Sequence, residues 1–436
     1  MADALLILVS KINPRISYTF SLFFTSLLPT EYKLTEDVEE YKSYNGPKFN
    51  YSTKPVEKDS LFFCASPLLH ETDLEPQTLN VSEWNGLKIF YQVDKGVLPF
   101  DLFAAAFYLV SRYEEYLADS KDKHKRFRAN DSLAFKNHFL DQPIVNLWAA
   151  ELKKVLLEKY PSLQIKQNKY TFTPTIDIDV AYAHLGRNIF VTIGSFLRAL
   201  VKLNINLLAE KTLTLLRLRK DKYDSYDYQE EIFRKYKVKP IYFFLAAKRA
   251  MYDKNISTTS KHFARLVKKV ENFADVGIHP SYSSQSISEN VKQEIRKVER
   301  YMKNPITKSR QHFLRVNLPE TYRCLAALNI NDDYSLAYAS CPGFRASICI
   351  PFFFYDLQKE EALPIKIHPS IVMDGTLKEY MQITPNDAIV VIEKLIAETK
   401  RSGGEFVSIW HNHSLGPDTE WKDWIKVFET IMEKAV

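Results

Sequence analysis

Residues 170–179 read Tyr-Thr-Phe-Thr-Pro-Thr-Ile-Asp-Ile-Asp, and they mark a change of pattern in the chain. The run from Tyr170 to Ile176 predicts a short strand, which leads directly into Asp177 and Asp179. Alternation along an extended chain puts these two carboxylates on one side, so that one can bind a metal ion while the other acts as a base. Aspartates are also common in exposed turns, and Asp179 is equally suited to capping a following helix. The pair therefore gains meaning only from partners on other strands.

Short apolar runs recur beyond residue 170 and alternate with helical segments, a pattern typical of a parallel β/α array. We expect strands at 170–176, 240–245, 275–278, 312–316, 334–339, 363–367 and 405–410, and helices at 226–236, 260–273, 286–301, 319–328, 386–401 and 418–434. Seven strands predict an α/β protein with a distorted or incomplete (β/α)7-type barrel. Active sites in such barrels lie at the carboxyl ends of the strands.

The first 165 residues have a mixed α and β pattern. We expect a strand at 5–10, a buried helix in the aromatic segment 18–28, a helix at 102–117 with Asp101 as its N-cap, and a helix at 147–160 ended by Pro161. Arg112, Glu114 and Glu115 are interpreted as ion pairs on a helix surface. The polar stretch 161–170 suggests a boundary between a smaller N-terminal domain at 1–165 and a barrel domain at 166–436.

Composition excludes several classes of function. Only 11 of the 436 residues are glycine, and neither glycine-rich phosphate-binding motif is present. The 59 basic and 53 acidic side chains leave a charge of +6, too small over this surface to predict a nucleic-acid partner. The four cysteines are far apart and contain no C-x-x-C pair, so we expect reduced thiols rather than a zinc ribbon or a disulfide framework. The apolar N-terminus resembles neither a signal peptide nor a membrane span, so we expect a cytoplasmic protein.

Histidines follow two of the expected strands. His279 comes after the run at 275–278, and His411-Asn412-His413 comes after the run at 405–410. Period-two geometry puts His411 and His413 on one face, where one of them suits a general acid and the other a metal ligand. Arg315, on the expected strand 312–316, can hold a catalytic carboxylate through two hydrogen bonds or pair with a structural acid.

Taken together, these motifs resemble the polysaccharide deacetylases of the NodB-homology type, in carbohydrate esterase family 4. The closest resemblance is to a divergent subfamily common in Bacteroidetes, in which an N-terminal domain of unknown function precedes the barrel. The resemblance covers nearly the whole chain and rests on residues 99–104, 111–116, 174–179, 277–282, 310–315, 343–346 and 410–412.

The resemblance implies metal-dependent hydrolysis of N-acetyl groups on sugars, usually with Zn²⁺. It implies that Asp177 is the general base, that Asp179 and His279 are metal ligands, and that His411 protonates the leaving amine. It also implies that Arg315, in the arginine-proline motif with Pro319, orients the catalytic aspartate.

The chain departs from the family pattern at one ligand. The second histidine of the family's metal motif is replaced here by Ser283, and His312 and His413 are the nearest candidates to complete the site. A site with Asp179, His279 and water alone would bind zinc weakly.

Three functions follow as hypotheses. The first is a metal-dependent deacetylase acting on an N-acetylated carbohydrate, in surface-polysaccharide metabolism. The second is a catalytically decayed deacetylase-like module that binds glycans, and the third is a glycoside hydrolase with paired carboxylates. Separately, the apolar and basic segment 188–222 predicts either peripheral contact with an anionic membrane or extra helices docked on the barrel.

Overall fold

The structure is a computed structural model, and it describes residues 4–118, 120–284, 286–416 and 420–436. The chain forms two compact units and passes between them five times. Unit 1 comprises residues 1–171, 343–369 and 397–405, and unit 2 comprises residues 172–342, 370–396 and 406–436. Each unit collects segments from distant parts of the sequence. The division into independent domains at residue 165 stays a prediction.

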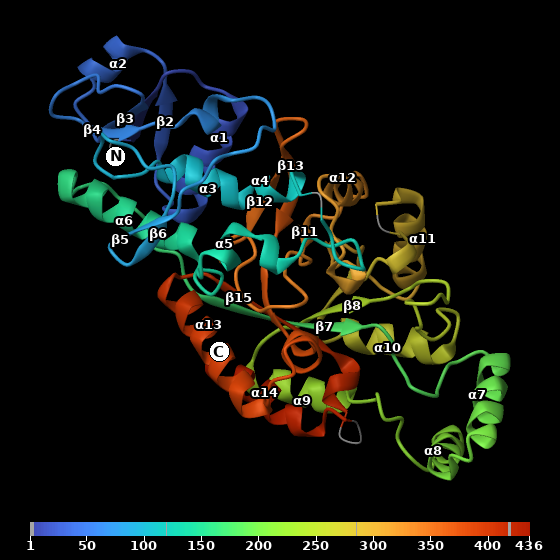
Figure 1. Cartoon of the computed structure of the whole chain (residues 1–436). Coiled ribbons are helices and arrows are strands. Elements are labelled where there is room, and N and C mark those ends of the chain that lie inside the picture. Colours follow the sequence, from blue (N-terminus) through green and yellow to red (C-terminus); the bar gives the residue numbers. More distant parts are fainter. Residues whose placement is uncertain (1–3, 119, 285, 417–419) are drawn as a thin grey trace. The chain divides into compact units, whose positions relative to one another are not determined.

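Unit 1 is built on a parallel sheet of four strands in the order β2-β1-β3-β4 (Figure 1). These strands are β1 Leu5–Val9, β2 Tyr32–Thr35, β3 Lys48–Ser52 and β4 Leu61–Cys64. Antiparallel hairpins form from β5 Ser82–Trp84 with β6 Leu87–Ile89, and from β12 Phe352–Asp356 with β13 Glu361–Ile367. The helices are α1 Pro14–Ser21, a π-helix at Leu22–Leu27, α2 Val38–Ser43, α3 Leu102–Val110, α4 Tyr113–Tyr116, α5 Leu133–Lys136 and α6 Ile144–Lys159. The strand predicted at 5–10 is confirmed by β1, all of whose residues are buried.

The core of unit 1 is aromatic and centres on α3. The ring of Phe103 lies 4.6–6.1 Å, between centroids, from the rings of Phe20, Phe23, Phe49, Tyr51 and Phe63. Asp101 caps the helix as predicted, with Oδ1 accepting from the backbone N–H groups of Phe103 and Ala104. The helix ends at Val110, earlier than predicted, because Arg112 takes up a left-handed conformation with φ 58°.

The ion pairs predicted for a helix surface are buried instead. Arg112 donates to Glu114 and Glu115 at 2.8 Å each, and Arg345 donates to both carboxylate oxygens of Glu115. Burial alone would raise the pKa of Glu115, but the two guanidinium groups lower it to about 2. The cluster is an internal charge network of unit 1, and the prediction of a surface location was wrong.

Unit 2 contains the β/α array. Its strands lie side by side in the order β11-β10-β9-β8-β7-β15-β14, and the pairings β7–β8, β8–β9, β9–β10, β10–β11 and β14–β15 are parallel (Figure 1). The strands are β7 Thr171–Ile178, β8 Ile241–Phe244, β9 Asp275–Ile278, β10 Lys308–Ser309, β11 Asp332–Asp333, β14 Ser370–Met373 and β15 Glu405–His411. The helices are α7 Ile189–Val201, α8 Ile205–Leu215, α9 Tyr226–Tyr236, α10 Lys261–Glu271, α11 Ser288–Glu299, α12 Glu320–Ala327, α13 Pro385–Arg401 and α14 Ile425–Ala435. The α/β class is confirmed, and the linear strand order describes an open sheet, in keeping with an incomplete barrel.

Two predicted strands were wrong and one lies elsewhere. Residues 312–314 form a 3-10 turn in which Phe313 and Leu314 have positive φ, and the strand of this region is the shorter β10. Residues 334–339 are irregular and follow β11. The strand predicted at 363–367 is present as β13, but it belongs to unit 1 and not to the β/α array of unit 2.

None of the helices within the described part of the chain has the length and apolar character needed to cross a bilayer.

Asp101 offers a test of the unit 1 core. Its Oδ2 also accepts from the Tyr51 hydroxyl at 2.8 Å and the Ser66 N–H at 2.6 Å, so Asp101→Ala removes a helix cap and leaves two buried donors unpaired. We expect a loss of about 2–4 kcal/mol in the free energy of unfolding, measured by chemical denaturation. Asp37→Ala, which removes the exposed cap of α2, is the matched control with an expected loss of about 1 kcal/mol. Equal losses would contradict the role assigned to the buried cap.

Candidate active site

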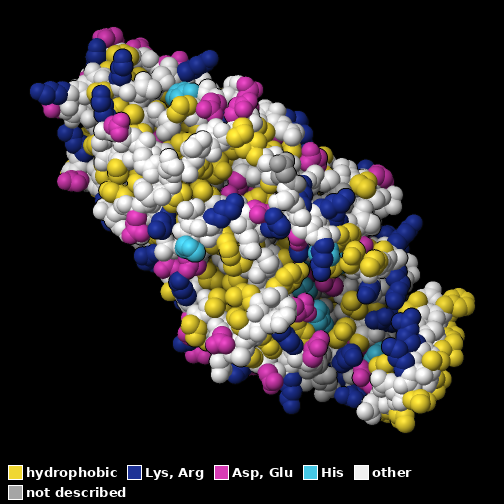
Figure 2. Space-filling model, viewed as in Figure 1, with side chains coloured by type: hydrophobic (Ala, Val, Ile, Leu, Met, Phe, Trp, Pro, Cys, Tyr) yellow, Lys and Arg dark blue, Asp and Glu magenta, His cyan; other side chains and the backbone are white. Residues whose placement is uncertain are grey.

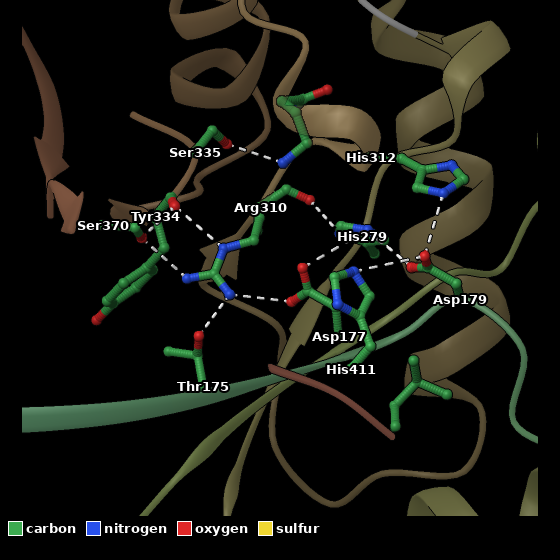
Figure 3. Close-up of polar contacts among 12 residues, drawn as sticks. Thr175, Asp177, Asp179, His279, Arg310, His312, Tyr334, Ser335, Ser370 and His411 are labelled. Atoms are coloured by element: carbon green, nitrogen blue, oxygen red, sulfur yellow. Dashed lines mark hydrogen bonds and ion pairs between the residues drawn. The ribbon is translucent and has the colours of Figure 1, made fainter. Parts of the chain in front are cut away.

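The polar residues predicted to carry chemistry meet at one edge of the unit 2 sheet. Asp179 follows the last residue of β7, His279 follows the last residue of β9, and His411 ends β15. Because parallel strands end at the same edge, their terminal side chains converge there. Figure 3 shows Asp177, Asp179, His279, His312 and His411 with their side chains directed toward one another.

Asp179, His279 and His312 form a group that can hold a metal ion. One donor atom of each lies within 4.8 Å of the others. Nε2 of His279 is 3.2 Å from Asp179 Oδ1, and Nε2 of His312 is 3.5 Å from Asp179 Oδ2. Two imidazoles and a carboxylate are a donor set that zinc and other divalent transition metals accept.

The far side of each imidazole is held by an acceptor. Nδ1 of His279 lies 2.6 Å from the carbonyl oxygen of Arg310, and Nδ1 of His312 lies 2.9 Å from Oδ1 of the buried Asp253. These oxygens accept a hydrogen bond from Nδ1–H of each ring, which leaves Nε2 to face Asp179. This second layer of contacts is what a histidine metal ligand needs to fix its tautomer and orientation.

Two further observations fit a bound cation. Asp179 Oδ1 is buried and finds no hydrogen-bond partner, as expected for an oxygen whose partner is an ion. Burial would lower the pKa of His312, but the carboxylates of Asp179 and Asp253 raise it to about 9. The cluster therefore stabilises positive charge at this point, and metal binding would displace a proton from His312.

Asp177 is buried beside this group and is paired with Arg310. Nη1 of Arg310 donates to Asp177 Oδ1 at 3.0 Å, and the other carboxylate oxygen lies 4.0 Å from His279 Nε2. The same guanidinium donates to Thr175 Oγ1, to Ser370 Oγ at 3.1 Å and to the carbonyl oxygen of Tyr334 at 3.1 Å. One oxygen of Asp177 is therefore engaged by a fixed cation, and the other is directed toward the metal group.

The family resemblance implied this task for Arg315, but the guanidinium that contacts Asp177 in the structure is that of Arg310. Arg315 donates to the carbonyl oxygen of Tyr282, and its guanidinium lies 3.8 Å from the centroid of the Tyr282 ring. The arginine at Asp177 lies five residues earlier, directly after β10. The expectation for Arg315 came from the arginine-proline motif that it forms with Pro319.

His411 forms a dyad with Asp374. Nδ1 of His411 is 2.7 Å from Asp374 Oδ1, while Asp374 Oδ2 accepts from the His411 N–H at 2.9 Å and from the Ser414 hydroxyl. Burial would lower the pKa of His411, but Asp374 raises it to about 10. Nε2 of His411 lies 3.7 Å from Asp179 Oδ2, so the dyad presents a proton donor to the metal group.

The other two candidate ligands lie outside the group of three. The ring of His413 packs against those of Tyr223, His411 and Trp421, with centroids 5.4–6.1 Å apart. The Ser283 hydroxyl lies 3.3 Å from that of Ser281. Of the three candidates, His312 is the one that the fold brings to Asp179 and His279.

Three residues of the site were missed from the sequence: Arg310, Asp253 and Asp374. Asp374 had a usable signal, because it directly follows the largely apolar run Ser370-Ile371-Val372-Met373, as Asp179 directly follows β7. Asp253 lies in an irregular segment without periodicity, where no comparable signal exists.

A model described as a family of unknown function (DUF7033) matches residues 5–161. Among curated proteins none matches the sequence.

Several solved structures are similar. They include a protein described as a polysaccharide deacetylase from Mycobacterium smegmatis, with a TM-score of 0.42 and 11% identity over 62% of this chain and 85% of that one. The polysaccharide deacetylase of Bacillus cereus has a TM-score of 0.29 and 8% identity over 62% and 87%. A family 4 carbohydrate esterase pseudoenzyme from Bacillus anthracis has a TM-score of 0.29 and 12% identity over 62% and 67%. Since these scores are low, we infer function from the side chains of the site.

The metal group can be tested by titration with Zn²⁺. The protein should bind one equivalent, His312→Ala and Asp179→Asn should weaken binding at least 100-fold, and Asp253→Asn should weaken it about 10–100-fold. Calorimetry against a competing chelator measures these constants. His413→Ala and Ser283→Ala are the controls, and a loss in either as large as that of His312→Ala would contradict the ligand set.

The corrected arginine can be tested by paired substitutions. Arg310→Leu leaves Asp177 as a buried, uncompensated charge, so we expect a loss of about 3–5 kcal/mol in the free energy of unfolding. Arg315→Leu removes a stacked guanidinium and should cost less than about 2 kcal/mol. Denaturation curves of both variants give the comparison, and the reverse order would restore Arg315 as the partner of Asp177.

Proposed function

We propose that this protein is a metal-dependent carbohydrate deacetylase that hydrolyses the N-acetyl group of an amino sugar. The observation that carries the proposal is the meeting of three functions within one site. A carboxylate held by arginine, a group of metal donors and a histidine–aspartate dyad all lie at the carboxyl edge of one sheet. Each corresponds to a motif on which the resemblance to polysaccharide deacetylases rests.

Asp177 is the proposed general base. Its Oδ1 is engaged by Arg310, and its Oδ2 faces His279 and is placed to take a proton from a water molecule beside the metal group. Arg310 keeps the carboxylate in register. The arginine is a positioning residue, because its contacts are with the protein.

His411 is the proposed general acid. Asp374 holds Nδ1, so Nε2 carries the proton that faces the reacting region near Asp179. As the C–N bond breaks, His411 gives this proton to the sugar nitrogen, and Asp177 has already taken one from the attacking water. The products are acetate and a free amino sugar, which balances the atoms of one water molecule and one amide.

Asp179, His279 and His312 would hold the metal ion, which we propose to be Zn²⁺. Such an ion lowers the pKa of a bound water and polarises the acetyl carbonyl. His312 would take the place of the second motif histidine, whose position is occupied here by Ser283. Asp253 orients His312. Two histidines and one carboxylate would match the three protein ligands of a catalytic zinc site.

We further propose a role in surface-polysaccharide metabolism with a nucleotide- or lipid-linked sugar as substrate. We also propose a cytoplasmic location, which the four free cysteines support.

The proposal predicts acetate release from N-acetylated sugars such as tri-N-acetylchitotriose or UDP-N-acetylglucosamine. Asp177→Asn and His411→Ala should each lower the rate at least 100-fold, because each removes a proton-transfer group. A coupled acetate assay measures the rate, and circular dichroism checks that the variants fold. Asp227→Asn and His138→Ala, at exposed positions, are the matched controls and should keep the full rate.

A chelator separates this function from its alternatives. Dipicolinate should abolish acetate release and Zn²⁺ should restore it. Activity that survives the chelator would contradict the metal-dependent mechanism. Full activity of both Asp177→Asn and His411→Ala would overturn the assignment of base and acid.

A further inference from the structure

Residues 187–222 form an excursion between β7 and α9 that catalysis does not use. The segment contains α7 and α8, which lie apart from the other helices of unit 2 (Figure 1). Asp221 closes its base, since its carboxylate accepts from the N–H groups of Ala183, His184 and Leu185. The structure thus presents a helical hairpin on an ordered base, and we refer to residues 187–222 as the hairpin.

The hairpin exposes an unusual amount of apolar surface. Of the 24 exposed large hydrophobic side chains in the described part of the chain, 12 belong to these 36 residues. Phe190 is 79% exposed, Val201 is 84% exposed and Ile205 is 76% exposed. Figure 2 shows this apolar surface along the outer edge of the hairpin, at the lower right of the view. A protein surface of this kind marks an interaction site, because water makes it costly to leave uncovered.

The hairpin also carries the entire net charge of the chain. It has eight Lys and Arg residues against two acidic residues, Glu210 and Asp221, a surplus of six. The whole chain has 59 basic and 53 acidic side chains, so the other 400 residues hold 51 of each and are neutral. In Figure 2 basic side chains lie beside the apolar edge. The partner of this surface is therefore apolar and anionic.

A basic cavity between the two helices gives a second observation. Its volume is about 250 Å³, and its lining includes Arg187, Lys211 and Lys222. Nε of Arg187 is buried without a hydrogen-bond partner, and Lys211 is 7% exposed, with Nζ donating to the Ser195 carbonyl oxygen at 2.9 Å. Glu210 pairs with Lys222 at 3.3 Å. The cavity is lined by three cations, and Glu210 and Asp221 are the neighbouring acids, so the positive balance favours a further anion such as the phosphate of a lipid headgroup.

We propose that the hairpin docks this protein onto an anionic lipid surface, with its apolar edge in the bilayer and its basic residues among the phosphates. Helices of 13 and 11 residues are about 20 Å and 16 Å long, too short for the 30 Å hydrocarbon core. They therefore lie in the plane of the interface, as amphipathic helices with a basic polar side do. Docking goes beyond the proposed function, because it requires neither Asp177 nor His411.

The ends of the hairpin segment lie beside the candidate site. The connection to α7 begins immediately after Asp179, at the carboxyl end of β7. At the other end, the ring centroids of Tyr223 and His413 lie 5.6 Å apart, and the Ser225 hydroxyl donates to the Asn412 carbonyl oxygen at 2.8 Å. The chain therefore runs into and out of the hairpin from the edge of the sheet at which the site lies.

Vesicle sedimentation of the full chain tests the proposal. The protein should pellet with phosphatidylcholine vesicles that contain 30% phosphatidylglycerol, and at least ten times less with phosphatidylcholine alone. A Phe190→Trp variant should show blue-shifted fluorescence on the anionic vesicles and be quenched by brominated acyl chains. These results would place the apolar edge in the bilayer.

A charge-matched pair of variants separates insertion from simple electrostatics. Phe190→Asp/Val201→Asp/Ile205→Asp should lose at least ten-fold in binding to anionic vesicles. Val38→Asp/Phe353→Asp/Val390→Asp adds the same three charges at exposed apolar positions outside the hairpin and should lose less than three-fold. Acetate release from a soluble sugar should stay unchanged in both, which keeps this test separate from that of the proposed function.

Three outcomes would overturn the proposal. One is a wild-type protein that stays in the supernatant with anionic vesicles. Another is equal loss in the two triple variants, which would assign binding to net charge. The third is a dimer, seen by analytical ultracentrifugation, that only the hairpin variant disrupts, together with a wild-type protein that does not bind vesicles. The apolar edge would then pack against a second copy of the chain.

Discussion

The buried guanidinium of Arg310 is the interaction on which unit 2 depends. The side chain is fully buried, and its donors reach Thr175 and Asp177 on β7, the carbonyl oxygen of Tyr334 after β11, and Ser370 on β14. It also lies 4.7 Å from the centroid of the Phe243 ring on β8. A buried cation is tolerated only when its donors are satisfied, and here the ends of several strands satisfy them. The contacts that tie these strand ends to Arg310 also hold Asp177 in place.

The site was predictable from the sequence where strands are long and end in polar residues. The strands β7 and β15, of eight and seven residues, and the shorter β9 show clear apolar runs, so Asp177, Asp179, His279 and His411 could be located. These side chains come together because parallel strands end at one edge. Their chemical roles rest on the proposal and not on the fold.

The prediction failed where strands are too short to leave a pattern. β10 and β11 have two residues each, so their positions were displaced into the apolar residues that follow. In the first case the displacement ran through Phe313 and Leu314, whose positive φ values form a turn that apolar composition does not reveal. The sequence also left the choice of the third metal ligand open. His312 is held by Asp253, which lies 59 residues away in the chain, and such a contact leaves no local pattern.

The discontinuity of the two units has a consequence for how the chain can be divided. Arg345 and Glu360 lie late in the sequence, yet their partners Glu115 and Arg15 lie near its beginning, and both pairs are within unit 1. A fragment starting near residue 166 would keep one member of each buried pair and lose the other. The polar stretch that looks like a linker is therefore a poor place for truncation. The chain must be synthesised through residue 405 before unit 1 has all its segments, so its native core is completed late in translation.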